Sequence, residues 1–236
     1  MSLFDRFQWI PIISLPHRHD RRKSMTRQLA GLGLGGDPRV AFFDAIRPSS
    51  EGAFDKIGTH GAFLSHLNVL REAARRKVWV LVLEDDCVFR PEVADYAFPD
   101  GCDIFYGGWE VLSDENDPHT SNVIGAHCMG FSPRAAELAV EYLSSLLESS
   151  DPIVPDEVAR DEHYRADIRP PVDGAYVWLR KVHPKLTTVF ADLSYQRPSR
   201  TDIGANKWFD RTPLVRDLAG MARRLRRSRS AKPRNG

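Results

Sequence analysis

The stretch VWVLVLEDD, residues 78–86, joins six apolar residues to three consecutive carboxylates. The apolar residues do not alternate with polar ones. This pattern is typical of a strand that is buried on both faces, as in a parallel sheet covered by helices. In open α/β sheets, ligands bind beyond the carboxyl ends of the strands. We therefore expect residues 84–86 to lie at a functional site.

The segments before this stretch alternate between strand and helix patterns. Short apolar runs predict strands, and apolar residues at helical spacing predict helices. In chain order these are a strand at 10–15, a helix capped by Asp20 that ends at the glycines from 31 onward, a strand at 40–43, a helix at 58–77 and the strand at 78–83. This order predicts an α/β fold, with a central, mostly parallel sheet flanked by helices.

The second half of the chain gives a weaker pattern. Residues 103–106 and 123–131 predict strands, and the second runs into Ser132-Pro133, a good start for a helix. Residues 149–171 are polar and broken by prolines, which predicts a loop region. A short helix is expected at 175–179.

The formal net charge of +1 conceals an uneven distribution. From Arg211 to the end, eight Arg and one Lys face one Asp, which gives +8. The other 210 residues hold 24 basic and 31 acidic groups, or −7. Because the body is acidic, a dedicated nucleic-acid binder is not expected.

Three cysteines without regular spacing predict neither a disulfide framework nor a cysteine zinc site. No secretory signal is recognised at the start of the sequence, and no run approaches the roughly 18 apolar residues that span a bilayer. We expect a cytoplasmic protein, either soluble or peripheral on the inner face of a membrane.

Three adjacent carboxylates repel one another, so they are costly unless something neutralises them. A hard divalent cation does so, and oxygen ligands suit Mg²⁺ or Mn²⁺. Alternate side chains of an extended segment point to the same side, which makes Glu84 and Asp86 the candidate metal ligands. The alternative is a solvated acidic turn, or a cap for a following helix.

Further motifs accompany the acidic triplet. In chain order they are I-S-L at 13–15 with D-R-R at 20–22, G-A-F-L-S-H at 61–66, V-L-E-D-D at 82–86, the segment 125–136, P-V-D at 171–173 and T-D-I at 201–203. In order and spacing, these motifs resemble glycosyltransferase family 25, which includes lipooligosaccharide galactosyltransferases and procollagen galactosyltransferase-like proteins. Ser14 and Ala62 depart from that pattern, which usually has Asn and Cys there.

The resemblance implies a GT-A-like, Rossmann-type fold and a nucleotide-sugar donor, commonly UDP-galactose. It also implies dependence on Mn²⁺ or Mg²⁺ and inversion at the anomeric carbon. The metal ligands would be Glu84 and Asp86. The residues expected at the donor are Arg21, Arg22, Ser65, His66, Glu84 and Asp202.

An inverting displacement needs one base to take the proton of the acceptor hydroxyl. Asp173 is the leading candidate because it matches the P-V-D motif, although an Asp there could equally cap the following helix. Asp103 and Asp202 are competitors for this role. His127 is expected to be structural, whereas Trp109 could stack on a sugar.

We expect a glycosyltransferase-like domain at 1–210 and a basic amphipathic helix with a disordered tail at 211–236. Leu214, Leu218, Met221 and Leu225 recur at helical spacing among arginines. Such a helix is typical of attachment to an anionic membrane surface, and packing on the acidic body is the alternative.

The sequence therefore predicts a metal-dependent inverting glycosyltransferase. It would move a hexose, galactose by resemblance, to a glycan or lipid-linked glycan acceptor in lipopolysaccharide or other cell-surface glycan biosynthesis. Nucleic acid is not an expected partner. One alternative is a catalytically inactive, glycosyltransferase-like scaffold at the membrane surface. Another is a nucleotidyltransferase, although no triphosphate-binding glycine loop is visible.

Overall fold

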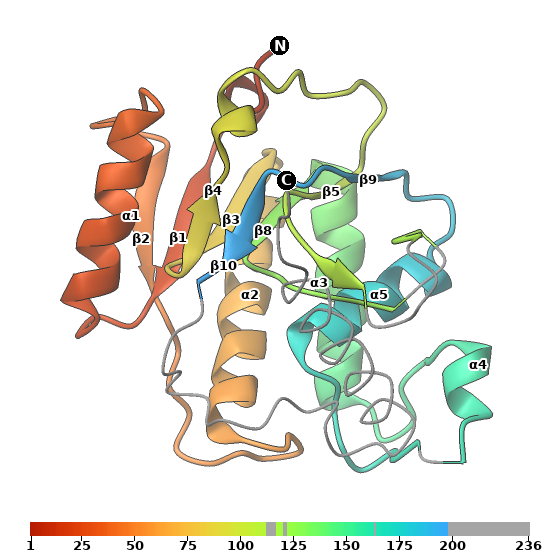
Figure 1. Ribbon diagram of the computed structural model, residues 1–236. Coiled ribbons are helices and arrows are strands. Elements are labelled where there is room, and N and C mark those ends of the chain that lie inside the picture. Colours follow the sequence, from red (N-terminus) through yellow and green to blue (C-terminus); the bar gives the residue numbers. More distant parts are fainter. Residues whose placement is uncertain (112–116, 120–121, 163, 198–236) are drawn as a thin grey trace, which may run out of the picture.

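A computed structural model describes residues 1–111, 117–119, 122–162 and 164–197 (Figure 1). Its centre is a six-stranded sheet with the order β2-β1-β3-β8-β5-β9. The strands are β1 (Ile10–Ser14), β2 (Val40–Asp44), β3 (Val80–Glu84), β5 (Ile104–Tyr106), β8 (Cys128–Phe131) and β9 (Thr188–Phe190). Strand β8 is antiparallel to both of its neighbours, and the other pairs are parallel. The expected α/β fold with a mostly parallel sheet is confirmed.

Two small sheets and several helices complete the described part of the chain. Strand β4 (Cys87–Phe89) pairs with β10 (Ser194–Gln196), and β6 (Glu110–Val111) pairs with β7 (Val123–Ile124). The helices are α1 (His19–Gly31), α2 (Ile57–Arg76), α3 (Pro133–Glu148), α4 (Asp156–Ala159) and α5 (Val172–Val182), with 3-10 turns η1 (Phe4–Arg6) and η2 (Pro91–Ala94).

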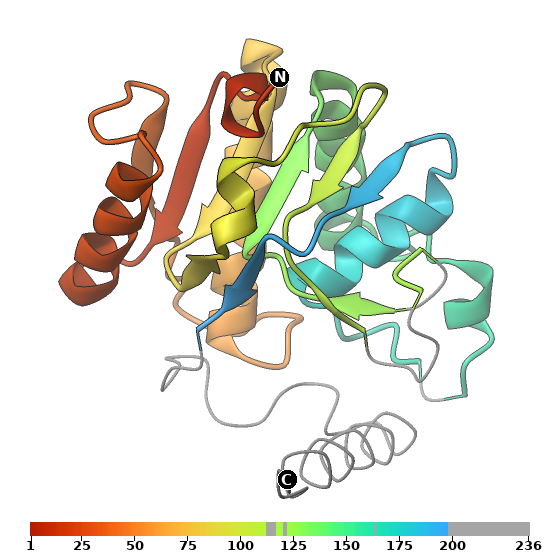
Figure 2. The ribbon, with the colours of Figure 1, turned by 45° about the horizontal axis from the view of Figure 1, so that its top comes forward.

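The connections reverse direction at β1. Helix α1 links β1 to β2 on one side, and α2 then leads back across to β3 on the other side of β1. Figures 1 and 2 show α1 at the β2 end of the sheet, with α2 and α3 side by side behind it. In sheets wound in both directions, this reversal opens a crevice at the carboxyl ends of the two strands. Those ends are Ser14 and Glu84.

Strand β3 contributes to the hydrophobic cores on both faces of the sheet. Val80 and Val82 pack with α2, α3 and α5, whereas Leu81 and Leu83 pack with α1 and η1. All four side chains are fully buried. Each contributes about 1.5–3 kcal/mol by leaving water. This burial on both faces confirms the prediction made from residues 78–83, and it places the acidic triplet at the end of β3.

Two predicted elements differ from the structure. The single strand expected at 123–131 is divided into β7 and β8, because Gly125 has a φ of +114° that no regular strand adopts. Asp20 does not cap α1: the N-cap position is Arg18, and Asp20 lies in the first turn, where its carboxylate accepts hydrogen bonds from Arg18.

The other differences concern length. Helix α5 is longer than the predicted 175–179 and places Asp173 in its first turn. The segment expected to be a loop, 149–171, contains the short helix α4. In the described part of the chain, no helix is both long and apolar enough to cross a membrane. The predicted basic helix from 211 onward lies outside the described residues.

Candidate functional site

The acidic triplet lies at the carboxyl end of β3 and sends its side chains in two directions. The side-chain nitrogen of Gln196 is 3.4 Å from Oε2 of Glu84 and 3.3 Å from Oδ1 of Asp86. The carboxylates of Glu84 and Asp86 therefore lie on the same side of the chain, as the alternation of side chains along an extended segment predicts. Asp85 points to β1, where its Oδ2 accepts a 2.7 Å hydrogen bond from the Ser14 hydroxyl.

Arg21 neutralises the other side of the triplet. Its Nη1 donates to Oδ1 of Asp85 at 2.7 Å and to Oδ2 of Asp86 at 3.1 Å. Only 13% of the Arg21 side chain and 8% of that of Asp85 are exposed, so this pair is shielded from solvent. Arg21 therefore lies at the triplet with its guanidinium engaged by protein carboxylates, and its expected role at the donor stays a prediction.

His66 connects Glu84 to the interior of the protein. Its Nε2 lies 3.1 Å from Oε1 of Glu84, and its Nδ1 lies 3.1 Å from the hydroxyl of Tyr176. Both His66 and Tyr176 are fully buried. Both contacts are satisfied when Nε2–H donates to Glu84 and the Tyr176 hydroxyl donates to Nδ1. His66 is thus a neighbour of the candidate metal ligand, brought to it by α2.

The pKa values of the two carboxylates that face Gln196 are shifted in opposite directions. Burial alone would raise the pKa of Glu84, but the contact with His66, with smaller contributions from His127 and Arg21, lowers it on balance. Burial, followed by the charge of Glu84, raises the pKa of Asp86 to about 7, and Arg21 only partly opposes this. The site therefore carries negative charge that the described side chains do not fully offset.

Gln196 is a site residue that sequence reasoning missed. It pairs with Cys87 in the β10–β4 ladder, and the next amide, that of Arg197, donates to the carbonyl of Asp86 at 2.9 Å. Strand β10 lies along β4 in front of the sheet in Figure 2. The contact joins positions 110 residues apart, and no local motif marks it.

Asp173 lies in the first turn of α5 and, among the residues that the structure describes, accepts hydrogen bonds from two backbone amides. Its Oδ1 accepts from the amide of Gly174 at 2.9 Å, and its Oδ2 accepts from that of Gly125 at 3.3 Å. Burial raises its pKa despite these two bonds, and the charge of Glu84 acts in the same direction. Asp173 is therefore within electrostatic range of the triplet. The N-cap position belongs to Pro171, so Asp173 is not the cap that the alternative reading expected.

Two predicted donor-binding residues are committed to the protein itself. Arg22 donates to the carbonyl of Ser14 at 2.9 Å and pairs with Asp44 at the end of β2. The buried hydroxyl of Ser65 donates to the carbonyl of Gly61 at 2.7 Å and accepts from the amide of Ile46 at 2.8 Å. These bonds hold the chain after β2 against α2, and the expected role of Ser65 at the donor stays a prediction.

Glycine at 61 is required by the same packing. A Cβ there would lie 2.5 Å from the carbonyl oxygen of Ile46, closer than real contacts allow. The G-A-F-L-S-H motif therefore has one structural end, Gly61 with Ser65, and one end at the site, His66.

The competitors for the base are placed differently. Asp103 precedes β5 and so lies at the amino edge of the sheet, where it accepts from Ser132 and from the amide of Thr187. This position argues against a role at the triplet. Asp202 lies outside the described residues.

Trp109 is half-buried with its ring edge against Phe190, 5.2 Å between centroids. His127 is buried, and its expected structural role stays a prediction.

The described residues offer two carboxylates and one carboxamide to a cation. Within the described ranges, no group of three or more His, Cys, Asp or Glu side chains is arranged to hold a metal. Glu84, Asp86 and Gln196 nevertheless carry hard oxygen atoms, which suit Mg²⁺ or Mn²⁺. Their excess negative charge fits a cation as well. The donor set is therefore compatible with the metal implied by the resemblance.

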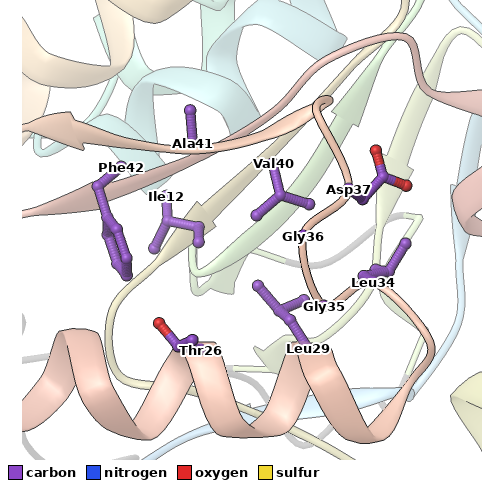
Figure 3. A pocket seen from close by; sticks show the side chains of 10 residues that line it. All are labelled: Ile12, Thr26, Leu29, Leu34, Gly35, Gly36, Asp37, Val40, Ala41 and Phe42. Carbon is purple, nitrogen blue, oxygen red and sulfur yellow. The ribbon is translucent and has the colours of Figure 1, made fainter.

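Two hollows beside α1 do not coincide with this site. The one in Figure 3, of about 170 Å³, has a mostly apolar lining that includes Leu29, Val40 and Phe42. A second, of about 370 Å³, is lined by residues near the amino end of β2, such as Asp37 and Arg39. Neither lining includes a member of the triplet or its partners.

Neither a family model nor a curated protein matches the sequence. Among solved structures, the chain is similar to a glycosyltransferase involved in the glycosylation of the major capsid of PBCV-1, with 12% identity, a TM-score of 0.44, and coverage of 78% of this chain and 82% of that chain.

Two other solved structures are similar to a comparable degree. One is a mutant of the Drosophila β1,4-galactosyltransferase 7 in complex with manganese, UDP-Gal and xylobiose, with 8% identity, a TM-score of 0.43, and coverage of 88% and 79%. The other is mouse xyloside xylosyltransferase 1 in its apo form, with 11% identity, a TM-score of 0.44, and coverage of 89% and 91%. At these values no residue role is transferred to this chain.

Proposed function

We propose that this protein is a divalent-cation-dependent, inverting glycosyltransferase of the family 25 type. The observation that carries the proposal is the pair Glu84 and Asp86, whose carboxylates converge on one atom at the carboxyl edge of the sheet, beside the β1–β3 reversal. The buried His66 and the largely shielded Arg21 hold that pair in place. Asp173 supplies a further carboxylate within its electrostatic range.

The leaving group of a nucleotide-sugar donor is a nucleoside diphosphate, whose negative charge grows as the glycosidic bond breaks. A cation held by Glu84 and Asp86 would supply Lewis-acid neutralisation of that charge. His66 favours the ionised form of Glu84 by donating to it. Arg21 offsets part of the charge of Asp85 and Asp86. These residues bind and orient; none of them reacts.

Asp173 acts as the base in this proposal. In a single displacement, the acceptor hydroxyl oxygen bonds to the anomeric carbon as the bond to the diphosphate oxygen breaks, and the hydroxyl proton passes to a carboxylate oxygen of Asp173. Its raised pKa favours taking up that proton. Its two backbone hydrogen bonds keep the carboxylate oriented at the start of α5.

The substrate assignments rest on the sequence motifs. We propose a UDP-hexose donor, with galactose first, and a glycan or lipid-linked glycan acceptor in lipopolysaccharide or other cell-surface glycan biosynthesis. The basic segment from 211 onward would attach the enzyme to the anionic inner face of the membrane, where a lipid-linked acceptor is found. The catalytically inactive scaffold is retained as an outcome of the test.

The test combines thermal unfolding with an assay of donor turnover. The full-length protein is incubated with a panel of UDP-sugars, with Mn²⁺ or with a chelator. We expect one UDP-sugar to raise Tm and to be turned over only with the cation, because a ligand stabilises only the state that binds it. Asp86→Ala is expected to abolish turnover without unfolding the chain.

The outcomes separate the alternatives. Donor binding without turnover, across a broad acceptor panel, would favour the inactive scaffold. Release of pyrophosphate from a nucleoside triphosphate would identify a nucleotidyltransferase. If the folded protein neither binds nor turns over any nucleotide sugar with the cation present, the proposed function is wrong.

A further inference from the structure

The side-chain nitrogen of Gln196 faces more carboxylate oxygens than its two hydrogens can bond well. Its Nε2 faces three oxygens, Oε2 of Glu84 at 3.4 Å and both Oδ atoms of Asp86 at 3.3 and 3.4 Å. An amide nitrogen has two hydrogens, so it cannot serve three acceptors well. All three distances also exceed the usual 2.7–3.2 Å of an N–H···O bond.

We propose that Gln196 is a third oxygen ligand of the divalent cation, and that its carboxamide group flips when the cation binds. In the cation-free protein, the amide NH₂ faces Glu84 and Asp86 and partly offsets their charge. With the cation bound between the carboxylates, the same side chain presents its carbonyl oxygen instead. This inference rests on the proposed function for the presence of a cation, and it adds a ligand that the motifs do not indicate.

The carboxamide suits such an exchange because its two ends are nearly equal in size. Rotation about the last side-chain bond replaces the NH₂ donor by the carbonyl oxygen without moving the backbone. Glutamine carbonyls are ordinary ligands of hard divalent cations. The set would then contain oxygens from Glu84, Asp86 and Gln196, leaving further positions for water and for diphosphate oxygens.

The backbone around Gln196 is anchored while its side chain is accessible. The β10–β4 ladder pairs it with Cys87, and the amide of Arg197 donates to the carbonyl of Asp86. The residue is exposed, so the carboxamide is free to turn. The ladder therefore keeps the side chain at the cation position, and solvent leaves it room to change orientation.

The test measures Mn²⁺ affinity by titration calorimetry on the full-length protein, without donor or acceptor. Gln196→Met keeps the length of the side chain but lacks both amide atoms. Gln196→Glu keeps an oxygen ligand and lacks the NH₂ donor. We expect the Met variant to bind Mn²⁺ at least about 10-fold more weakly than the wild type, and the Glu variant to bind at least as tightly.

Gln8→Glu is the matched control, because it makes the same chemical change at the opposite edge of the sheet. The Gln8 carbonyl accepts from the amide of Trp79, just before β3, and a carboxylate can still accept there. This variant should bind Mn²⁺ like the wild type. Circular dichroism and Tm of each cation-free variant verify that it is folded.

The results distinguish this inference from the proposed function. If the Met variant binds Mn²⁺ as tightly as the wild type, or more tightly, then Gln196 is only a competitor of the cation and the inference is wrong, while the proposed function stands. If the wild type binds no Mn²⁺, with or without UDP, the inference and the cation dependence of the proposed function both fail.

Discussion

Nε2 of His66 lies 3.1 Å from Oε1 of Glu84, although 18 residues separate them in the chain. His66 comes from α2, and Glu84 comes from the end of β3, the strand into which α2 leads. The hydroxyl of Tyr176, from α5, completes the chain of contacts at 3.1 Å from Nδ1. Three elements therefore determine the position and charge of one candidate ligand.

The first prediction concerns this buried chain of contacts. His66→Phe keeps an aromatic ring but leaves Glu84 and the Tyr176 hydroxyl without their partner. We expect the free energy of unfolding to fall by about 1–3 kcal/mol, because a buried polar group loses its hydrogen bond. Urea unfolding measures this loss. Tyr176→Phe, which deletes only the hydroxyl, should cost less, and an equal cost for both variants would contradict the chain of contacts.

The second prediction concerns pH and Asp173. Burial raises the pKa of this carboxyl group in the folded protein above its ordinary value of 3.8. A base must be ionised, so kcat/KM should decline as the pH falls through the raised pKa, at a higher pH than for an ordinary Asp. Asp173→Asn should lower turnover by about 10²–10⁴-fold. The pH profile of transfer is the measurement.

The same group gives an independent signature in stability. Between its ordinary pKa and its raised pKa, the folded protein binds more protons than the unfolded chain. The contribution of Asp173 to the free energy of unfolding is therefore largest at low pH and decreases as the pH rises through that interval. Asp173→Asn should lack this decrease. Urea unfolding at several pH values is the measurement, and the same pH dependence in the wild type and in Asp173→Asn would show that the pKa of Asp173 is not raised.

The third prediction compares a shielded ion pair with an exposed one. Asp85→Ala leaves the nearly buried guanidinium of Arg21 with one carboxylate fewer and removes the acceptor of the Ser14 hydroxyl. We expect the free energy of unfolding to fall by about 1–3 kcal/mol, because Arg21 and the Ser14 hydroxyl each lose one hydrogen bond while Arg21 keeps its pairing with Asp86. Asp20→Asn, at the exposed pair with Arg18, should leave the unfolding midpoint unchanged. Thermal or urea unfolding of both variants checks the contrast.

The fourth prediction concerns the end of α2. Lys77 follows the helix in a left-handed conformation, with φ +54° and ψ +45°, which is strained for a residue with a Cβ. Its side chain is exposed. Lys77→Gly should raise the free energy of unfolding by about 1 kcal/mol, because glycine adopts this conformation without strain. Lys77→Ala should give no such gain.

The central strand and the helix before it could be predicted because their signals are local. Residues 78–83 are apolar without alternation, and both faces of β3 are indeed buried. The α/β order followed from that strand and its neighbours. The division at Gly125 was missed because the segment 123–131 is otherwise as apolar as a strand. A single backbone angle, which composition does not reveal, interrupts it.

The site was less predictable because its members come from distant parts of the chain. Alternation along 84–86 correctly placed Glu84 and Asp86 together. Ser65 looked equivalent to His66 within one motif, yet a helix turns successive side chains by about 100°, so only one of the two faces Glu84. Gln196 carried no signal, since only the pairing of β10 with β4 brings it to the triplet.

The reversed strand β8 has a consequence for how this architecture can diversify. Because β8 is antiparallel to β3 and β5, its first residue lies at the edge where β5 ends. The connection between β5 and β8 therefore leaves and returns at the edge that carries the acidic triplet, and neither end of it interrupts the sheet. Under the proposed function, the length of this connection can change beside the triplet while the strand order and both cores persist.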